Sequence, residues 1–270
     1  MRCRLCFHLA RAQSGQVAVE TAIVLPLFVF LILGILQLGL MHQARLLTKY
    51  AAYKAVRAGS IHNASVKEME KAAVAVLLPV LAKRSSGSDG IEYVRPVSSG
   101  QEFTTKWNEM MGNEMGDTDL KYAEVTICGP TKKEVGGSGG ELDFDDPDNA
   151  ASEDWKGSHR TKLRVQVTFN YRLIIPFADW VIFQSTRARD LPMLMRMKVR
   201  DEDRRAEAPR RFGSASTGEG PYDAAASKRI YIAPIRATYT MRMQSNLYLN
   251  TDDLPESNEC LLPFSYKKSP

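Results

Sequence analysis

The stretch GQVAVETAIVLPLFVFLILGILQLGLM, residues 15–41, decides the architecture of this chain because it contains one long apolar run. From Ala22 to Met41, a length of 20 residues, the only side chain that can form a hydrogen bond is Gln37. A helix needs about 20 apolar residues to cross a bilayer, and lipid offers an irregular backbone no hydrogen-bond partners. A cleaved secretory signal would have a shorter apolar region followed by a small-x-small cleavage site, and no such site occurs before residue 50. The stretch therefore predicts a retained helix that spans a membrane once.

A carboxylate stands at the start of this apolar run. Glu20 follows Gly15 by five residues, and residues 1–15 carry three arginines and no acid. A cut after Gly15 would create an α-ammonium group on Gln16, about one helical turn away from Glu20. In a medium of low dielectric constant, pairing with this ammonium, or with that of a neighbouring subunit, would offset part of the cost of burying the carboxylate. The simpler alternative is a glutamate that the helix dipole favours near a helix N-terminus.

These residues resemble a known family. Gly15 to Glu20 followed by the apolar run looks like the processing site of a type IV prepilin. Residues 15–60 are similar to TadE-like minor pilins of the tight-adherence (Tad/Flp) pilus system, in Val19-Glu20, in Leu25-Pro26 and in the ending Ala55-Val56-Arg57-Ala58-Gly59. The resemblance implies a minor pilin, or pseudopilin, that a prepilin peptidase cuts between Gly15 and Gln16. Assembly would then proceed through the N-terminal helix and Glu20.

The resemblance also implies partners and a location. The partners are the prepilin peptidase, other Tad pilins and the inner-membrane assembly platform. The chain would span the bacterial inner membrane once, with its leader in the cytoplasm and its C-terminal domain in the periplasm, in association with a pilus. Charge does not decide this orientation, because basic residues stand on both sides of the apolar run. The alternative is a single-pass, membrane-anchored envelope protein whose periplasmic domain binds a partner, which requires no cleavage.

The N-terminal helix is expected to extend well beyond the membrane. Helix-forming residues continue to about residue 58, Pro26 should kink the helix locally, and Gly59 indicates its end. Small residues share one face of the later part of this helix, namely Ala44, Ala51, Ala55 and Ala58. Such a face allows a close approach by another helix. The sequence leaves open whether the neighbour is another pilin or the head of the same chain.

Further elements follow in the rest of the chain. Ser65 and Glu68 have the spacing of a capping box, and apolar residues recur at helical spacing as far as Val80, which predicts a second helix. Three later segments are rich in β-forming residues and predict strands: 121–128, 163–171 and 230–243. In the second segment the residues on one predicted face are Leu163, Val165, Val167, Phe169 and Tyr171. This apolar region continues in Leu173-Ile174-Ile175-Pro176 and in Trp180–Phe183.

We therefore expect an α+β protein. A long N-terminal transmembrane helix would continue into a small head made of one further helix and a three- to four-stranded, mainly antiparallel sheet. The domain organisation would comprise a leader at 1–15, the transmembrane and extended helix at 16–59, and a periplasmic head at 60–270, with flexible loops near 129–160 and 184–226.

Four cysteines divide into two pairs. Cys128 and Cys260 lie in the expected periplasmic head, where an oxidising compartment would permit a disulfide, although the sequence gives no distance between them. Cys3 and Cys6 form a C-x-x-C motif within the leader, so cleavage would discard them.

Chemistry-bearing motifs are few. The net charge of +5 is too small to indicate nucleic-acid binding, and the four histidines form no zinc-ligand pattern. The acidic segment 141–154 lacks the order of an EF-hand and is typical of a solvated loop, although calcium binding stays open. We expect no catalytic residues, no metal site and no cofactor, and hence a protein that is not an enzyme. An anchored periplasmic enzyme would instead require titratable side chains that converge on a pocket of the head.

Overall fold

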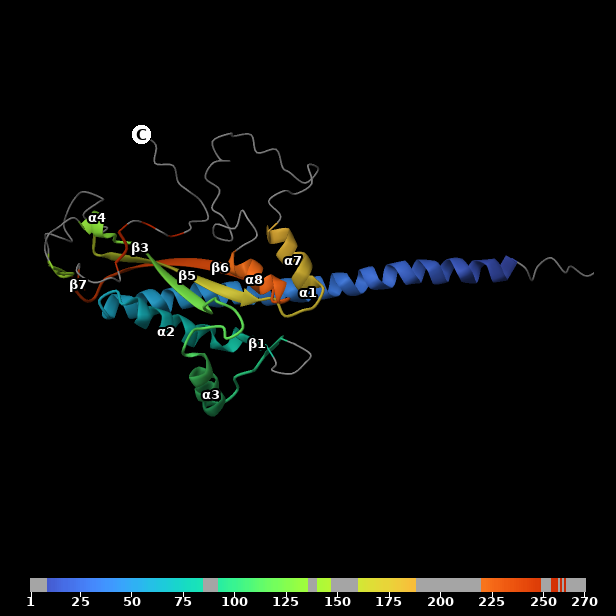
Figure 1. The fold of residues 1–270 in the computed structure, drawn as a ribbon, viewed down its shortest axis with the longest axis horizontal. Coiled ribbons are helices and arrows are strands. Elements are labelled where there is room, and N and C mark those ends of the chain that lie inside the picture. Colours follow the sequence, from blue (N-terminus) through green and yellow to red (C-terminus); the bar gives the residue numbers. More distant parts are fainter. Residues whose placement is uncertain are drawn as a thin grey trace, which may run out of the picture.

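One long helix with a head packed along its C-terminal half forms the molecule (Figure 1). The computed structural model describes residues 9–84, 92–135, 140–146, 160–187, 220–248, 254–256, 258 and 260. The helices are α1 (Leu9–Ile61), α2 (Val66–Leu77), the 3-10 helix η1 (Leu78–Val80), α3 (Gly100–Met110), α4 (Lys132–Val135), α7 (Ala178–Arg187) and α8 (Pro221–Ser227). The strands are β1 (Ala82–Arg84), β2 (Glu92–Val94), β3 (Ala123–Gly129), β4 (Glu141–Leu142), β5 (Lys162–Arg172), β6 (Ile232–Arg242) and β7 (Leu247–Tyr248).

The main sheet has the strand order β3-β5-β6 and is antiparallel throughout. The middle strand, β5, is covered on both faces. One face carries the predicted apolar set, and all five side chains of that set are buried. This face packs on α1, because Leu163 lies directly against Gly59. On the other face Gln166, Thr168, Asn170 and Arg172 are also buried, and Tyr222 of α8 donates a hydrogen bond to Asn170 Oδ1 (2.8 Å).

The structure confirms the predicted fold class: a long N-terminal apolar helix followed by a small α+β head with antiparallel sheets. The three predicted strands are confirmed as β3, β5 and β6. The sequence did not predict α3, α7 and α8, nor the short ladders β1–β2 and β4–β7. The apolar segment 173–183 contains no continuation of β5 but turns at Pro176 and begins α7. Proline lacks the N–H of a strand ladder, and Asp179 suits the first turn of a helix.

The alanine face of α1 packs on the protein's own head. Ala44, Ala51 and Ala55 are fully buried and Ala58 is half-buried, where α1 contacts α2, β5 and β6. The hydroxyl of Thr48 on the same face donates to the Ala44 carbonyl (2.7 Å), so this buried polar group is satisfied within the helix. Of the two neighbours that the sequence left open, the structure therefore selects the head.

Gly59 was predicted to stop the first helix, and this prediction is wrong. α1 continues to Ile61, and the residues that end it are Asn63 and Ala64, with left-handed φ of 54° and 59°. The Ala64 N–H closes the end by bonding the Gly59 carbonyl (2.8 Å). Gly59 serves the packing instead, since a Cβ atom there would lie 2.5 Å from Met69 Sδ and 2.8 Å from Leu163 Cδ2.

The predicted capping box is also wrong in its details. Ser65 is the N-cap of α2, but its side chain makes no capping hydrogen bond, and Glu68 pairs instead with Lys71 (2.7 Å). A capping box does form at α3, where Ser99 accepts from the Glu102 N–H and Glu102 accepts from the Ser99 N–H. Spacing alone therefore located the start of α2 but not the partners of its side chains.

Several sequence predictions fall partly or wholly outside the described residues. Cys3 and Cys6, residues 147–154 of the acidic segment, and most of 184–219 belong to this group. Within the two predicted loop regions, the described residues include α4, β4 and α8.

Replacing Gly59 by alanine should destabilise the head, because the added methyl group forces Met69 and Leu163 to move. We expect a loss of about 1–3 kcal/mol in the free energy of unfolding, the usual cost of overpacking a core. Thermal unfolding of the full chain in detergent, followed by near-UV circular dichroism, measures it. Gly100→Ala is the matched control, since a Cβ there meets nothing within 4 Å. Equal melting temperatures for the two variants would contradict this account of Gly59.

Candidate functional site

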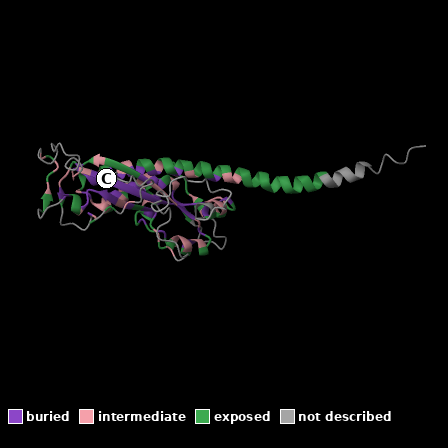
Figure 2. Cartoon of the chain, turned by 90° about the horizontal axis from the view of Figure 1, so that it is seen from above, coloured by how far each residue is buried: buried purple, intermediate pink, exposed green. Residues whose placement is uncertain are grey.

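The N-terminal half of α1 extends beyond the head and exposes apolar side chains around its whole circumference. Every residue from Val17 to Ile32 is exposed, as the green part of the long helix in Figure 2 shows. Within the described residues, Val17–Ile61 is the one helix long and apolar enough to cross a membrane, and only 6% of its most apolar window is buried. A core helix of a soluble protein would be mostly buried. The exposed half therefore suits lipid or other helices.

Glu20 lies in the first part of this exposed half, surrounded along the helix by Val19, Ile23 and Val24. The neighbouring Thr21 turns its hydroxyl into its own helix, where it donates to the Val17 carbonyl (2.9 Å) and reaches the Ala18 carbonyl (3.1 Å). Thr21 therefore has its hydrogen bond inside the helix, whereas Glu20 contributes an exposed acidic group at this level.

Gly15 and Gln16 are part of the helical backbone of α1, which begins at Leu9. Gln16 stands four residues before Glu20, or about 6 Å along the helix axis. A chain that began at Gln16 would thus carry the Glu20 carboxylate near the first turn of its helix.

Gln37 had no predicted role, and the structure provides one. Its side chain is fully buried where α1 enters the head, and its Oε1 accepts a hydrogen bond from the Ile175 N–H (2.9 Å). Ile175 lies between β5 and α7, so this bond fixes the head at one height along the helix. The signal was present in the sequence, since Gln37 is the only polar side chain within a 20-residue apolar run.

Cys128 and Cys260 form a disulfide that ties the C-terminal segment to β3. Cys128 lies near the end of β3 that pairs with Val165 and Arg164, at the start of β5. Gln37, in contrast, contacts the segment that follows the end of β5. The disulfide and Glu20 therefore lie at opposite ends of the molecule, and the structure does not bring the predicted site residues together.

A buried ion pair network connects separate parts of the head. The Arg172 guanidinium contacts Asp117 and Glu92, the latter at 3.4 Å. Burial by itself lowers the pKa of Arg172, but the two carboxylates more than offset this effect and raise its pKa. Because the charge is neutralised by fixed partners, the network fits a structural role.

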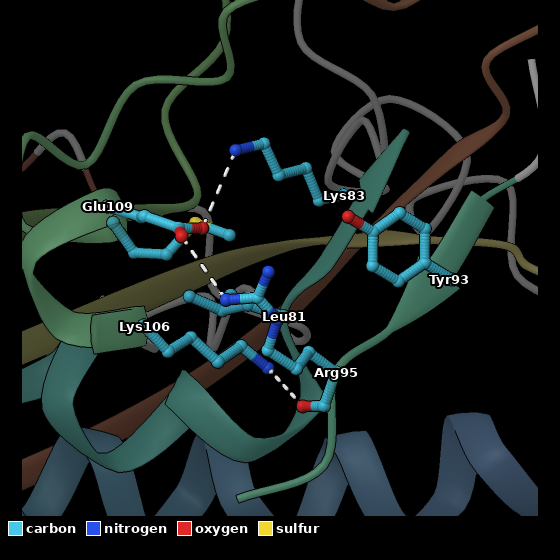
Figure 3. Close-up of a pocket in the computed structure, with 7 residues that line it drawn as sticks. Leu81, Lys83, Tyr93, Arg95, Lys106 and Glu109 are labelled. Atoms are coloured by element: carbon cyan, nitrogen blue, oxygen red, sulfur yellow. Dashed lines mark hydrogen bonds and ion pairs between the residues drawn. The ribbon is translucent and has the colours of Figure 1, made fainter. Parts of the chain in front are cut away.

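Among the described residues, Lys106 is a second buried cation, and it lines a small cavity beside α3 (Figure 3). Burial and the nearby Arg95 charge lower its pKa, and its Nζ donates to the Arg95 carbonyl (2.9 Å). Glu109 forms ion pairs with Lys83 (3.5 Å) and Arg95 (3.2 Å), and all three residues line the same cavity. The cavity volume of about 10 Å³ leaves room for about one water molecule and for no substrate.

The described residues contain no group of three or more His, Cys, Asp and Glu side chains that could hold a metal ion. The candidate functional surface of the described residues is therefore the exposed N-terminal half of α1, which carries Glu20, rather than a pocket.

Comparison with known proteins also points to the N-terminal helix α1 as the part of the chain that carries the function. Residues 15–57 match the family model described as TadE-like protein, which confirms the resemblance predicted from the sequence. The matched segment runs from the glycine before Glu20 almost to the end of α1, and the rest of the chain lies outside it. No curated protein matches the chain, and no solved structure matches it. The family match indicates a protein related to the Tad pilus with an N-terminal membrane helix.

Replacing Gln37 by leucine should destabilise the contact between α1 and the head. Leucine has a similar volume but accepts no hydrogen bond, so the Ile175 N–H would lose its partner in an apolar setting. We expect a loss of about 1–3 kcal/mol in the free energy of unfolding, measured by thermal denaturation of the full chain in detergent. Gln43→Leu, at an exposed position of the same helix, is the control and should change stability little. Unchanged stability of the Gln37 variant would show that the bond is dispensable.

Proposed function

We propose that this protein is a minor pilin or pseudopilin of a Tad-type pilus or secretion apparatus. A prepilin peptidase cuts it between Gly15 and Gln16, and the mature protein assembles through its N-terminal helix. The observation that carries the proposal is the TadE-like match over residues 15–57, which includes the half of α1 that the head leaves exposed and has Glu20 near its start.

Assembly uses the part of α1 that the head does not cover. Because Ala44, Ala51 and Ala55 are buried in the subunit itself, contacts with other pilins fall on the exposed residues from Val17 to Ile32. In this segment Glu20 is the one acidic side chain, and it sets the axial register by pairing with the α-ammonium group of Gln16 in a neighbouring subunit.

The strength of electrostatic attraction among apolar helices explains how a single charge can fix the axial register of a subunit. Two opposite unit charges 4 Å apart attract by about 1 kcal/mol in water, but by about 4 kcal/mol at an effective dielectric constant near 20. Among packed apolar helices a subunit displaced along the axis would bury both charges without partners, which costs several kcal/mol. The pair therefore penalises every register but one.

The same proposal places the protein in the bacterial inner membrane with its leader in the cytoplasm and its head in the periplasm. A disulfide between Cys128 and Cys260 supports this orientation, because disulfides persist in oxidising compartments. The protein acts as a structural subunit rather than as an enzyme. Its partners are the prepilin peptidase, other Tad pilins and the inner-membrane assembly platform.

A single-pass envelope protein with a partner-binding periplasmic domain is the second candidate. It shares the exposed membrane helix but requires neither processing nor the Glu20 pair, so processing distinguishes the two.

The intact mass of the protein extracted from membranes tests the processing step. In cells with the prepilin peptidase we expect the mass of residues 16–270, lower by two hydrogen atoms than the fully reduced chain because of the Cys128–Cys260 disulfide. Cells without the peptidase should yield the chain with residues 1–15 attached. A full-length chain in both strains would instead favour the plain envelope protein.

Glu20→Ala should leave membrane insertion and cleavage intact but lower the recovery of the protein in the pilus fraction. Loss of a pair worth about 4 kcal/mol predicts a decrease of tenfold or more, measured by quantitative immunoblotting of sheared pili and membranes. Thr21→Ala is the matched control, since its hydroxyl bonds only its own helix. Equal recovery of both variants would refute the role given to Glu20.

A further inference from the structure

The length of the exposed helix raises a question about where the membrane ends. The fully exposed stretch from Val17 to Ile32 has 16 residues and spans about 24 Å, less than the hydrocarbon thickness of about 30 Å. The apolar run continues to Met41, but there the head already covers part of the helix: Leu33 and Gly34 are half-buried and Gln37 is fully buried. A bilayer that matches the apolar run must therefore reach the near end of the head.

The part of the head at this level is the turn that leads into α7. Ile175 bonds Gln37, and α7 contacts α1 directly. Figure 1 shows α7 beside α1 at the point where the bare helix leaves the head, whereas β7 lies at the opposite end.

The exposed side chains of this segment are Pro176, Phe177 and Trp180, and the partly buried Asp179 lies between the two aromatic residues in sequence. Phe177 is 73% exposed, the highest value for any large hydrophobic side chain in the part of the chain that the structure describes, and Trp180 is 53% exposed. The opposite side of α7 is buried in the head, with Ala178 and Phe183 each 1% exposed. The turn before α7 and the first turn of α7 thus present two aromatic side chains, Phe177 and Trp180, next to the exposed apolar half of α1.

The backbone holds Phe177 in an unfavourable conformation. Its φ is 68°, in the left-handed region that bulky residues rarely adopt. A strained backbone that carries an exposed aromatic ring would be doubly unfavourable in water, whereas insertion of the ring into an apolar surface removes the second cost.

We propose that Pro176 to Val181 form a second membrane contact, in which Phe177 and Trp180 insert into the interfacial region of the bilayer beside α1. The inference rests on the proposed membrane anchoring and adds to it a docked orientation of the head. Lipid is the occupant because this aromatic face lies beside the apolar run, at a level that the bilayer must reach. Tryptophan, like tyrosine, is enriched at that depth of membrane proteins, and the Phe177 ring gains by leaving water. The Gln37–Ile175 bond sets the height of the head along α1. A subunit that leaves the membrane to enter a filament must therefore withdraw Phe177 and Trp180 from the bilayer as well as its transmembrane helix.

Fluorescence quenching of the full chain in phospholipid vesicles tests the proposal. Trp107→Phe and Trp155→Phe leave Trp180 as the only tryptophan. We expect lipids brominated near the headgroup end of the acyl chain to quench Trp180 strongly, and aqueous acrylamide to quench it several-fold less than an exposed residue.

Two reporters in a background without the three native tryptophans calibrate this result. Phe28→Trp marks the membrane span, and Tyr248→Trp marks the exposed far end of the head. Bromolipids should quench the first, and acrylamide should quench the second.

A Trp180 that acrylamide reaches as readily as the Tyr248→Trp reporter would overturn the inference. A Trp180 shielded from both quenchers would overturn it too, since a protein surface such as a second copy would then cover it. If bromolipids fail to quench the Phe28→Trp reporter, the membrane anchor itself is refuted, and this inference with it.

Phe177→Gly provides a second variant that should fold, because glycine adopts a left-handed φ without strain. It removes one of the two inserting rings. In the protein with Trp180 as its only tryptophan, we expect bromolipid quenching of Trp180 to decrease. Unchanged quenching would overturn the insertion of Phe177.

Discussion

The close approach of α1 to the sheet of its own head is the constraint on which the rest of the structure depends. Side chains no larger than alanine line the contact at Ala44, Ala51, Ala55 and Gly59, and all of them are buried. A larger side chain at Gly59 would overlap Met69 and Leu163. Because this face of the helix is used within the subunit, the exposed N-terminal half is the part of α1 that remains for lipid and for other helices.

Several interactions hold the head together and attach it to α1. β5 is buried on both faces, one against α1 and the other against polar partners such as Tyr222. Arg172 binds Asp117 and Glu92 at one end of this strand, and the Cys128–Cys260 disulfide lies toward the other end. These contacts therefore fasten both ends of β5 to other parts of the head.

A buried polar residue, Gln37, marks the boundary between the exposed half of α1 and the half that the head covers. Gln37 is a polar residue in an apolar run, and burying it without a partner would be costly. Its Oε1 accepts a hydrogen bond from the Ile175 N–H, which offsets part of that cost and sets the height at which the head meets the helix, while its Nε2 is buried without a hydrogen-bond partner among the described residues. The exposed aromatic side chains Phe177 and Trp180 lie close to this boundary, because Ile175 immediately precedes their segment.

The sequence by itself determined the membrane-type helix, its TadE-like character, the second helix and the three strands of the main sheet. Each of these depends on local periodicity and length, which a linear chain displays directly. Glu20 and Gly15 were found in the same way, because their spacing is a property of one helix. Of these, the TadE-like character is confirmed by the family match and the fold class by the structure.

Only the tertiary structure decided what the helix faces contact. Periodicity shows that Ala44, Ala51 and Ala55 share a face, but their neighbours are β5, β6 and α2, which are distant in sequence. Gly59 was misread as a helix end for the same reason, since the atoms that require a glycine belong to Met69 and Leu163. The role of Gln37 depends on Ile175, which lies 138 residues away. Close packing and buried hydrogen bonds are properties of pairs of residues, and the chain has to fold before those pairs exist.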